Sequence, residues 1–174
     1  SVKYILLGAF SSAILLYGVS QIYGHLGTTN LTQIQQELSL NSDMSMGLII
    51  GFSMFIVGFL FKIGIVPFHM WIPDVYEGAS TPVTVYLAVL VKIAVVALFM
   101  RVIISGLMPI AQDWQFILIG FSIISMVIGN VVALIQSNIK RLLAYASIGH
   151  AGYILLGIAA IGTLDQKGLI IIDF

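Results

Sequence analysis

The chain has 174 residues, of which 60% are hydrophobic and only 8% are charged, and its mean hydropathy is +1.11. Its 7 basic and 7 acidic side chains cancel, which excludes the basic field of a nucleic-acid-binding protein. It has no cysteine, which excludes disulfides and thiolate or iron–sulfur ligation within this piece. Soluble domains carry about 25% charged residues. The composition therefore predicts an all-α, polytopic transmembrane helix bundle in contact with the lipid bilayer.

Apolar stretches follow one another along the chain, and each predicts a membrane helix. A helix needs roughly 20 residues to cross about 30 Å of hydrocarbon. Four stretches have about that length, and they cover residues 4–24, 82–104, 114–136 and 142–161. We interpret residues 1–174 as a single membrane domain, with the polar segment 27–43 outside the bilayer.

The stretch over residues 44–76 is too long for one straight helix, and it contains Gly64 and Pro67. Proline lacks a backbone donor and clashes with the preceding turn of a helix. We therefore expect one discontinuous helix, broken near residues 64–68. Backbone groups freed by such a break are tolerated only where protein or water covers them, and such breaks recur at the ion sites of transporters.

The basic residues predict the orientation of the chain in the membrane. Lys3, Lys140 and Arg141 fall on one side of the expected helices, and Arg101 and Lys167 fall on the other. Basic residues favour the inner side of a membrane. The side of Lys3 and Lys140-Arg141 is then cytoplasmic, matrix or stromal, in a bacterial inner membrane or an organellar energy-converting membrane.

Lys92 is the residue that points most directly to function. It lies nine residues after Val83 and nine before Arg101, which is about 14 Å from either end of the helix. A lysine at this depth costs about 2.5–3.5 kcal/mol even on lenient insertion scales. A carboxylate, a water-filled cavity or loss of the proton must compensate. The alternative to a functional role is a structural ion pair inside the bundle.

Lys62 lies just before the expected break, 18 residues after Met44. It marks either an ion site or the end of a helix, from which its side chain extends to the membrane surface. The apolar residues 63–66 that follow it favour the ion site. Burial and a like charge nearby both disfavour a protonated amine, and two coupled amines titrate as a pair. Lys62 and Lys92 therefore form a candidate proton relay, pointing into the bundle and approaching each other through polar or hydrated space.

Two histidines are candidate members of the relay, because a histidine can accept and release a proton near neutral pH. His150 lies about nine residues inside the last apolar stretch, and His69 follows Pro67 at the break. Each could equally be a histidine held by a hydrogen bond to a neighbouring helix. A stripe of small and polar residues on the fourth helix is read as packing rather than a conduction path; it comprises Ser122, Ser125, Gly129, Ala133 and Gln136. Asp74 and Glu77 are read as solvated or bonded to helix ends.

Residues 1–10, 61–101 and 138–153 together resemble the antiporter-like membrane subunits of respiratory complex I, NADH:quinone oxidoreductase. This family also includes subunits of multisubunit cation/proton antiporters and related hydrogenases. The matching features are Lys62, the run from Pro67 to Asp74, the turn at residues 81–83, Lys92, the block over residues 138–153 and the opening residues 1–10. The sequence PDVYEG at residues 73–78 is most similar to the subunit N (subunit 2) branch.

The resemblance implies a fold of roughly fourteen membrane helices built from two inverted repeats. This piece would hold helices six to ten, with Lys62 on the broken helix seven, Lys92 on helix eight and His150 on helix ten. The family also uses a glutamate before this segment and a lysine after it. We therefore expect an incomplete unit of conduction. Residues 163–174 depart from the pattern expected of the next helix.

The leading functional hypothesis is a proton-translocating subunit of a complex I-type enzyme, assembled with other membrane subunits. Electrons would flow elsewhere, from NADH or another donor to quinone, because no motif here binds NADH, flavin or a cluster. The runner-up is a subunit of a multisubunit cation/proton antiporter. A purely structural scaffold is disfavoured by the two buried lysines.

Overall fold

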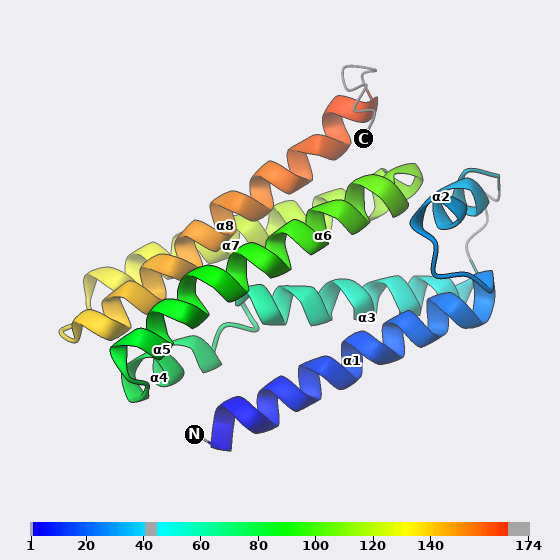
Figure 1. The fold of residues 1–174 in the computed structure, drawn as a ribbon. Helices are drawn as coiled ribbons and strands as arrows, with labels where there is room; N and C mark the ends of the chain where they lie inside the picture. Colours follow the sequence, from blue (N-terminus) through cyan, green and yellow to red (C-terminus); the bar gives the residue numbers. More distant parts are fainter. Residues whose placement is uncertain (1, 41–44, 167–174) are drawn as a thin grey trace.

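The computed structural model describes residues 2–40 and 45–166, and the regular structure in these ranges is entirely helical (Figure 1). This agrees with the all-α fold predicted. Five helical segments of the described chain are long and apolar enough to cross a membrane: Val2–Leu26, Met46–Ile63, Thr81–Gly106, Met108–Leu134 and Ile139–Gly162.

The elements follow the expected order, with shorter pieces between the long helices. They are α1 (Val2–Leu26), α2 (Leu31–Leu40), α3 (Met46–Ile63), α4 (Trp71–Gly78), α5 (Thr81–Tyr86), the π-helical η1 (Leu87–Val91), α6 (Lys92–Gly106), the 3₁₀ turn η2 (Met108–Ile110), α7 (Ala111–Leu134) and α8 (Ile139–Gln166). Because α5, η1 and α6 are continuous, they form one long helix that we call the α5–α6 helix.

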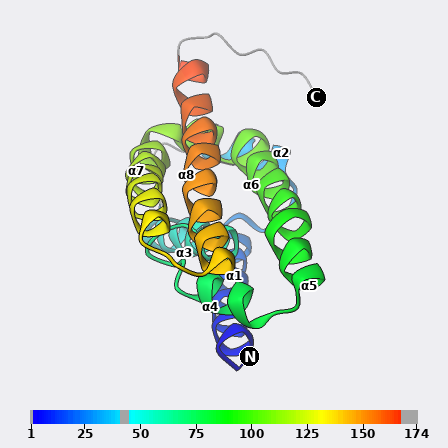
Figure 2. The ribbon, with the colours of Figure 1, turned by 90° about the vertical axis from the view of Figure 1, so that its left-hand side faces the viewer.

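The long helices pack as two close pairs, α1 with α3 and α7 with α8, and the α5–α6 helix runs beside them (Figure 2). Small residues permit the close approach. A Cβ atom on Gly18 would lie 2.6 Å from the backbone nitrogen of Phe55, and one on Gly129 would lie 2.5 Å from that of Gly149. Ser122 and Ser125, from the same stripe as Gly129, are fully buried. This part of the stripe serves packing, as predicted.

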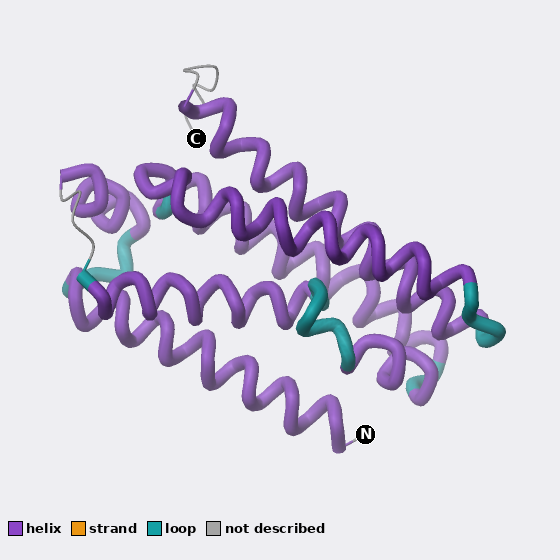
Figure 3. The backbone as a smooth tube through the Cα atoms, turned by 180° about the vertical axis from the view of Figure 1, so that it is seen from behind, coloured by secondary structure: helices purple, strands orange, loops and turns teal. Residues whose placement is uncertain are grey.

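The predicted break in the second membrane helix is present. Helix α3 ends at Ile63, and Gly64 adopts the left-handed conformation with φ 84°. Leu60 O accepts hydrogen bonds from the nitrogens of Gly64 and Ile65, at 2.9 and 3.0 Å. Helix α4 begins only at Trp71, and the intervening loop lies in the middle of the molecule (Figure 3). Glycine supports this geometry because positive φ is strained for other residues.

Side chains from elsewhere bond the backbone groups that the break frees. The nitrogen of Val66 donates to Ser125 Oγ on α7 at 3.0 Å, in a buried position. Trp71 Nε1 donates to the carbonyl oxygen of Phe61 at 3.1 Å. Since an unpaired backbone group costs several kcal/mol in a membrane, these bonds stabilise the break.

Two elements were not predicted. Helix α2 lies inside the segment 27–43 that the sequence analysis read only as a polar loop, and it buries Ile34 and Leu38 against the bundle. The long helix expected over residues 82–104 contains the π-helical segment η1, which ends directly before Lys92. The run around η1 is apolar on every side, so its hydrophobic pattern carries no sign of the change in helical winding.

We predict that Gly64→Ala destabilises the protein by about 1–3 kcal/mol, because alanine is strained at positive φ. The new methyl group would also overlap Cδ1 of Ile72. The measurement is the thermal midpoint of the detergent-solubilised parent complex. Gly120→Ala is the matched control, because a Cβ atom there meets nothing within 4 Å. Equal midpoints for the two variants would contradict the role assigned to Gly64.

We predict that Ser125→Ala lowers stability by about 1–3 kcal/mol, because it leaves the buried N–H of Val66 without its acceptor. The control is Ser53→Ala on α3, whose exposed hydroxyl donates only to Ile49 O of its own helix. The same thermal measurement compares them. A Ser125→Ala complex as stable as the Ser53→Ala complex would show that Val66 finds another partner.

Candidate functional site

Lys92 begins α6, directly after the π-helical segment. It is eleven residues from Thr81 and fourteen from Gly106, or about 17 and 21 Å from the ends of the helix. Its side chain is partly buried and turned toward α8. Nζ donates to Ser147 Oγ at 3.0 Å and to Ser147 O at 3.3 Å. Both acceptors are neutral, and no carboxylate of residues 2–40 or 45–162 pairs with this amine.

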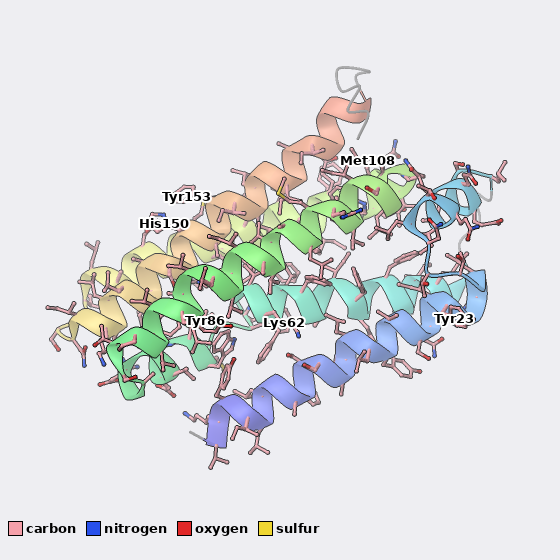
Figure 4. All side chains as sticks on the ribbon, in the orientation of Figure 1. Tyr23, Lys62, Tyr86, Met108, His150 and Tyr153 are labelled. Carbon is pink, nitrogen blue, oxygen red and sulfur yellow. The ribbon has the colours of Figure 1, made fainter. Side chains whose placement is uncertain are left out.

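Lys62, in the last turn of α3, lines a cavity of about 360 Å³ between α1, α3 and the α5–α6 helix. The polar residues Tyr4, Ser11 and Ser12 of α1 line the same cavity. Figure 4 shows the Lys62 side chain in the space between α3 and α1. Lys62 is partly buried, and it has no hydrogen bond or ion pair with another described residue.

The two lysines face different neighbours. The cavity beside Lys62 is closed on one side by Val91 and Val95, which flank Lys92 on the same helix, whereas the Lys92 nitrogen lies on Ser147 of α8. No hydrogen bond joins the two side chains in the described structure. Both lysines are turned toward protein, and their coupling through polar space stays a prediction.

His69 lies in the loop of the break, partly buried, and its ring centroid is 6.4 Å from that of Tyr145 on α8. Its Nδ1 atom is buried without a hydrogen-bond partner. Buried polar atoms are bonded as a rule. A backbone group of Pro67 lies close enough to interact with the ring, without a hydrogen bond of normal geometry to Nδ1. The role of His69 in a relay stays a prediction.

His150 lies on the outer face of α8 and is exposed, with its ring 6.3 Å from that of Tyr153 (Figure 4). The face of α8 that packs into the molecule consists of Ala144, Ile148, Ala151, Leu155 and Ile158. No hydrogen bond of the described residues joins His150 to either lysine, although it lies one turn after Ser147, which accepts from Lys92. Its predicted part in the relay is not tested by the described contacts.

A cluster of ion pairs lies at one end of the bundle. Lys3 Nζ is 2.7 Å from Asp74 Oδ2, and Arg141 Nη1 is 2.7 Å from Glu77 Oε2 and 3.4 Å from Asp74 Oδ1. Lys140 Nζ donates to Ala79 O at 2.8 Å. The contacts place Lys3, Lys140 and Arg141 at the same end, as the sequence predicted.

This cluster joins α1, α4 and the start of α8. The sequence predicts that Asp74 and Glu77 are solvated or bonded to helix ends, and it gives no sign of their pairing with Lys3 and Arg141. These partners are 64 to 71 positions away along the chain, so only the folded arrangement reveals them. Arg101 lies away from the cluster, beside Asn30 and Thr32 at the start of α2. Lys167, predicted on the side of Arg101, lies outside the described residues.

Ser147 is the site residue that the sequence analysis missed. It stands three positions before His150 in an apolar helix, and nothing in its local sequence distinguishes it from a packing serine. Besides accepting from Lys92, its hydroxyl donates to Ala144 O at 2.8 Å. Its contact with Lys92 depends on the packing of α8 beside the α5–α6 helix.

Residues 1–172 match the family model described as NADH:quinone oxidoreductase/Mrp antiporter, TM. The chain is 49% identical over 169 residues to NADH-quinone oxidoreductase subunit N of Rhodospirillum rubrum, covering 97% of this chain and 35% of the relative. The chain thus spans about a third of the length of the curated relatives it matches.

Two solved structures share the fold. A chain of respiratory complex I from Thermus thermophilus matches with TM-score 0.72 and 35% identity, over 96% of this chain and 35% of the other. A chain of the Mrp complex from Dietzia sp. matches with TM-score 0.79 and 25% identity, over 90% of this chain and 28% of the other. With five apolar helices and a family model that covers nearly its whole length, the chain is an integral membrane protein that belongs to the NADH:quinone oxidoreductase/Mrp antiporter transmembrane family.

Proposed function

We propose that this chain is part of a proton-translocating membrane subunit of a complex I-type NADH:quinone oxidoreductase, in which Lys92 carries the proton. The observation that carries the proposal is the setting of Lys92. Its amine lies well inside a membrane-spanning helix, and among the described residues it is bonded only to the hydroxyl and carbonyl of Ser147.

The neutral partners favour a titrating lysine over a structural ion pair. A carboxylate would hold the ammonium form firmly, whereas two neutral oxygens leave much of the desolvation cost uncompensated. An amine in this position can lose its proton at modest cost and regain it from a neighbour. A group poised between two charge states is what a relay needs.

Lys62 and its cavity supply the second proton-binding position of the proposed relay. The cavity of about 360 Å³ contains hydroxyl groups from α1, and a polar cavity of this size has room for water. A charge on Lys62 disfavours protonation of Lys92, so that arrival of a proton at one amine favours departure from the other. His69, which lies in the loop of the break, is a further candidate member of the relay, and His150 is retained as a candidate on the outer face of α8.

The similarity to known proteins favours the oxidoreductase over a cation/proton antiporter. Identity is 49% to the Rhodospirillum rubrum subunit N and 25% to the chain of the Dietzia Mrp complex. The protein would then work with other membrane subunits, and the oxidation of NADH and the reduction of quinone would take place outside this chain. Its contribution to the enzyme is translocation rather than redox chemistry.

We further propose that the end of the bundle carrying Lys3, Lys140 and Arg141 faces the cytoplasm, or the matrix or stroma of an organelle. Basic residues near membrane helices favour that side. Although Asp74 and Glu77 pair with two of these residues, acidic residues count little toward orientation.

We predict that Lys92→Met abolishes most proton uptake while the complex still assembles. Methionine keeps an apolar side chain of similar length and is easier to bury in a membrane. Lys92→Arg should not rescue uptake, because arginine does not release its proton in proteins. The measurement is proton uptake by vesicles that carry the assembled complex, normalised to complex content. Lys140→Met at the membrane surface is the control. Full uptake by Lys92→Met would falsify the carrier role.

We predict that Ser137→Cys, in the exposed loop between α7 and α8, reacts with a membrane-impermeant maleimide only when the cytoplasmic face is accessible. Thr29→Cys, in the loop between α1 and α2 at the other end of α1, should show the opposite pattern. Both are compared in intact cells and inverted vesicles, in a background with other cysteines replaced. The reverse pattern would invert the proposed orientation.

A further inference from the structure

Tyr76 on α4 has a hydroxyl that the packing does not account for. The side chain is 1% exposed, and its oxygen is buried with no hydrogen-bond partner among the described atoms. Hydroxyls in this position are bonded as a rule. Phenylalanine would fill the same space without an unpaired polar group. Packing alone therefore does not account for a tyrosine rather than a phenylalanine at this position.

The hydrogen-bonding side chain next to the Tyr76 hydroxyl is Ser147. The two hydroxyls are neighbours but make no direct hydrogen bond of normal geometry. Ser147 Oγ is also the closest acceptor of the Lys92 amine, at 3.0 Å. Helix α4, through Tyr76, and the α5–α6 helix, through Lys92, thus meet at a single serine of α8.

Tyr4 of α1 is within electrostatic range of the Tyr76 hydroxyl. Tyr4 lines the cavity of Lys62 and packs against Trp71, with ring centroids 5.5 Å apart. The polar groups therefore run from Lys92 through Ser147 and Tyr76 to Tyr4, at the edge of the cavity that Lys62 lines. This arrangement offers a route around the break between Lys92 and the cavity that Lys62 lines.

We propose that the hydroxyls of Ser147 and Tyr76 relay protons between Lys92 and the cavity of Lys62. The proposal rests on the proposed function of Lys92 as a proton carrier. Ser147 touches the amine and passes its proton, and Tyr76 acts through Ser147. The unpaired oxygen of Tyr76 is then a receiving position for a proton that arrives only during turnover.

The transfer is a concerted exchange in which each hydroxyl ends with one proton. In the present geometry Ser147 accepts from Lys92 and donates to Ala144 O at 2.8 Å. Rotation about the Cβ–Oγ bond turns the serine proton from Ala144 O toward the Tyr76 oxygen, as hydroxyl protons do readily. The Lys92 ammonium then gives one proton to Ser147, Ser147 gives its own to Tyr76, and Tyr76 releases one toward the cavity. Lys92 is left as a neutral amine.

The test uses vesicles that carry the assembled parent complex with Ser147→Ala, Ser147→Thr, Tyr76→Phe or Lys92→Met. Tyr76→Phe should leave the thermal midpoint unchanged or higher, because it removes a buried unpaired group, while proton uptake falls by roughly tenfold or more. Ser147→Ala should lose uptake to a similar extent. Ser147→Thr, which keeps a hydroxyl, should restore most of it.

Matched controls are Ser53→Ala on α3 and Tyr86→Phe on α5, whose side chains are exposed and do not line the cavity of Lys62. Both should take up protons like the wild type. Normal uptake by Tyr76→Phe and Ser147→Ala, with loss in Lys92→Met, overturns the relay through these hydroxyls and leaves the carrier role of Lys92 intact. Normal uptake by Lys92→Met overturns the proposed function itself, so the two failures are distinguished.

Discussion

Inside a bilayer the backbone must bond its own polar groups, and the break between α3 and α4 is where this chain meets that constraint without a continuous helix. Gly64 turns the chain away from the axis of α3. The nitrogen of Val66 is then bonded by Ser125 of α7, and the carbonyl of Phe61 by the indole of Trp71. Because these partners lie on other segments, the break holds its shape only within the packed bundle.

The break also places α3 and α4 against different helices, so Lys62 and Tyr76 have different neighbours. Helix α3 stays with α1 and places Lys62 in the cavity between them, whereas α4 packs against α8 through Ile72, Ala144 and Ile148. The α5–α6 helix spans both halves. It closes the cavity of Lys62 with Val91 and extends Lys92 to Ser147 of α8. An unbroken helix would carry α4 away from α8 and remove Tyr76 from Ser147.

The basic side chains at the end of the bundle and those inside the membrane helices have different hydrogen-bonding partners. At one end of the bundle Lys3 and Arg141 share the carboxylate of Asp74, and such exposed pairs stabilise only modestly because water screens them. Deeper in the helices the amine of Lys92 donates to two neutral oxygens of Ser147. The surface charges are paired with carboxylates, whereas the amine of Lys92 is bonded to neutral groups. This contrast is the physical basis of the proposed relay.

The sequence by itself determined the class of protein, the membrane helices, the break near Gly64 and the two lysines as candidates. These follow from hydrophobicity over about 20 residues and from proline and glycine chemistry, which are local properties. The tertiary structure alone decided what each polar side chain meets. It paired Lys92 with Ser147, 55 positions away, left His150 on the outer face of α8, and buried the hydroxyl of Tyr76 beside Ser147. Such contacts depend on how separate helices are rotated and placed against one another. An apolar helix can turn the same residues toward lipid or toward protein, so its own sequence does not specify this rotation.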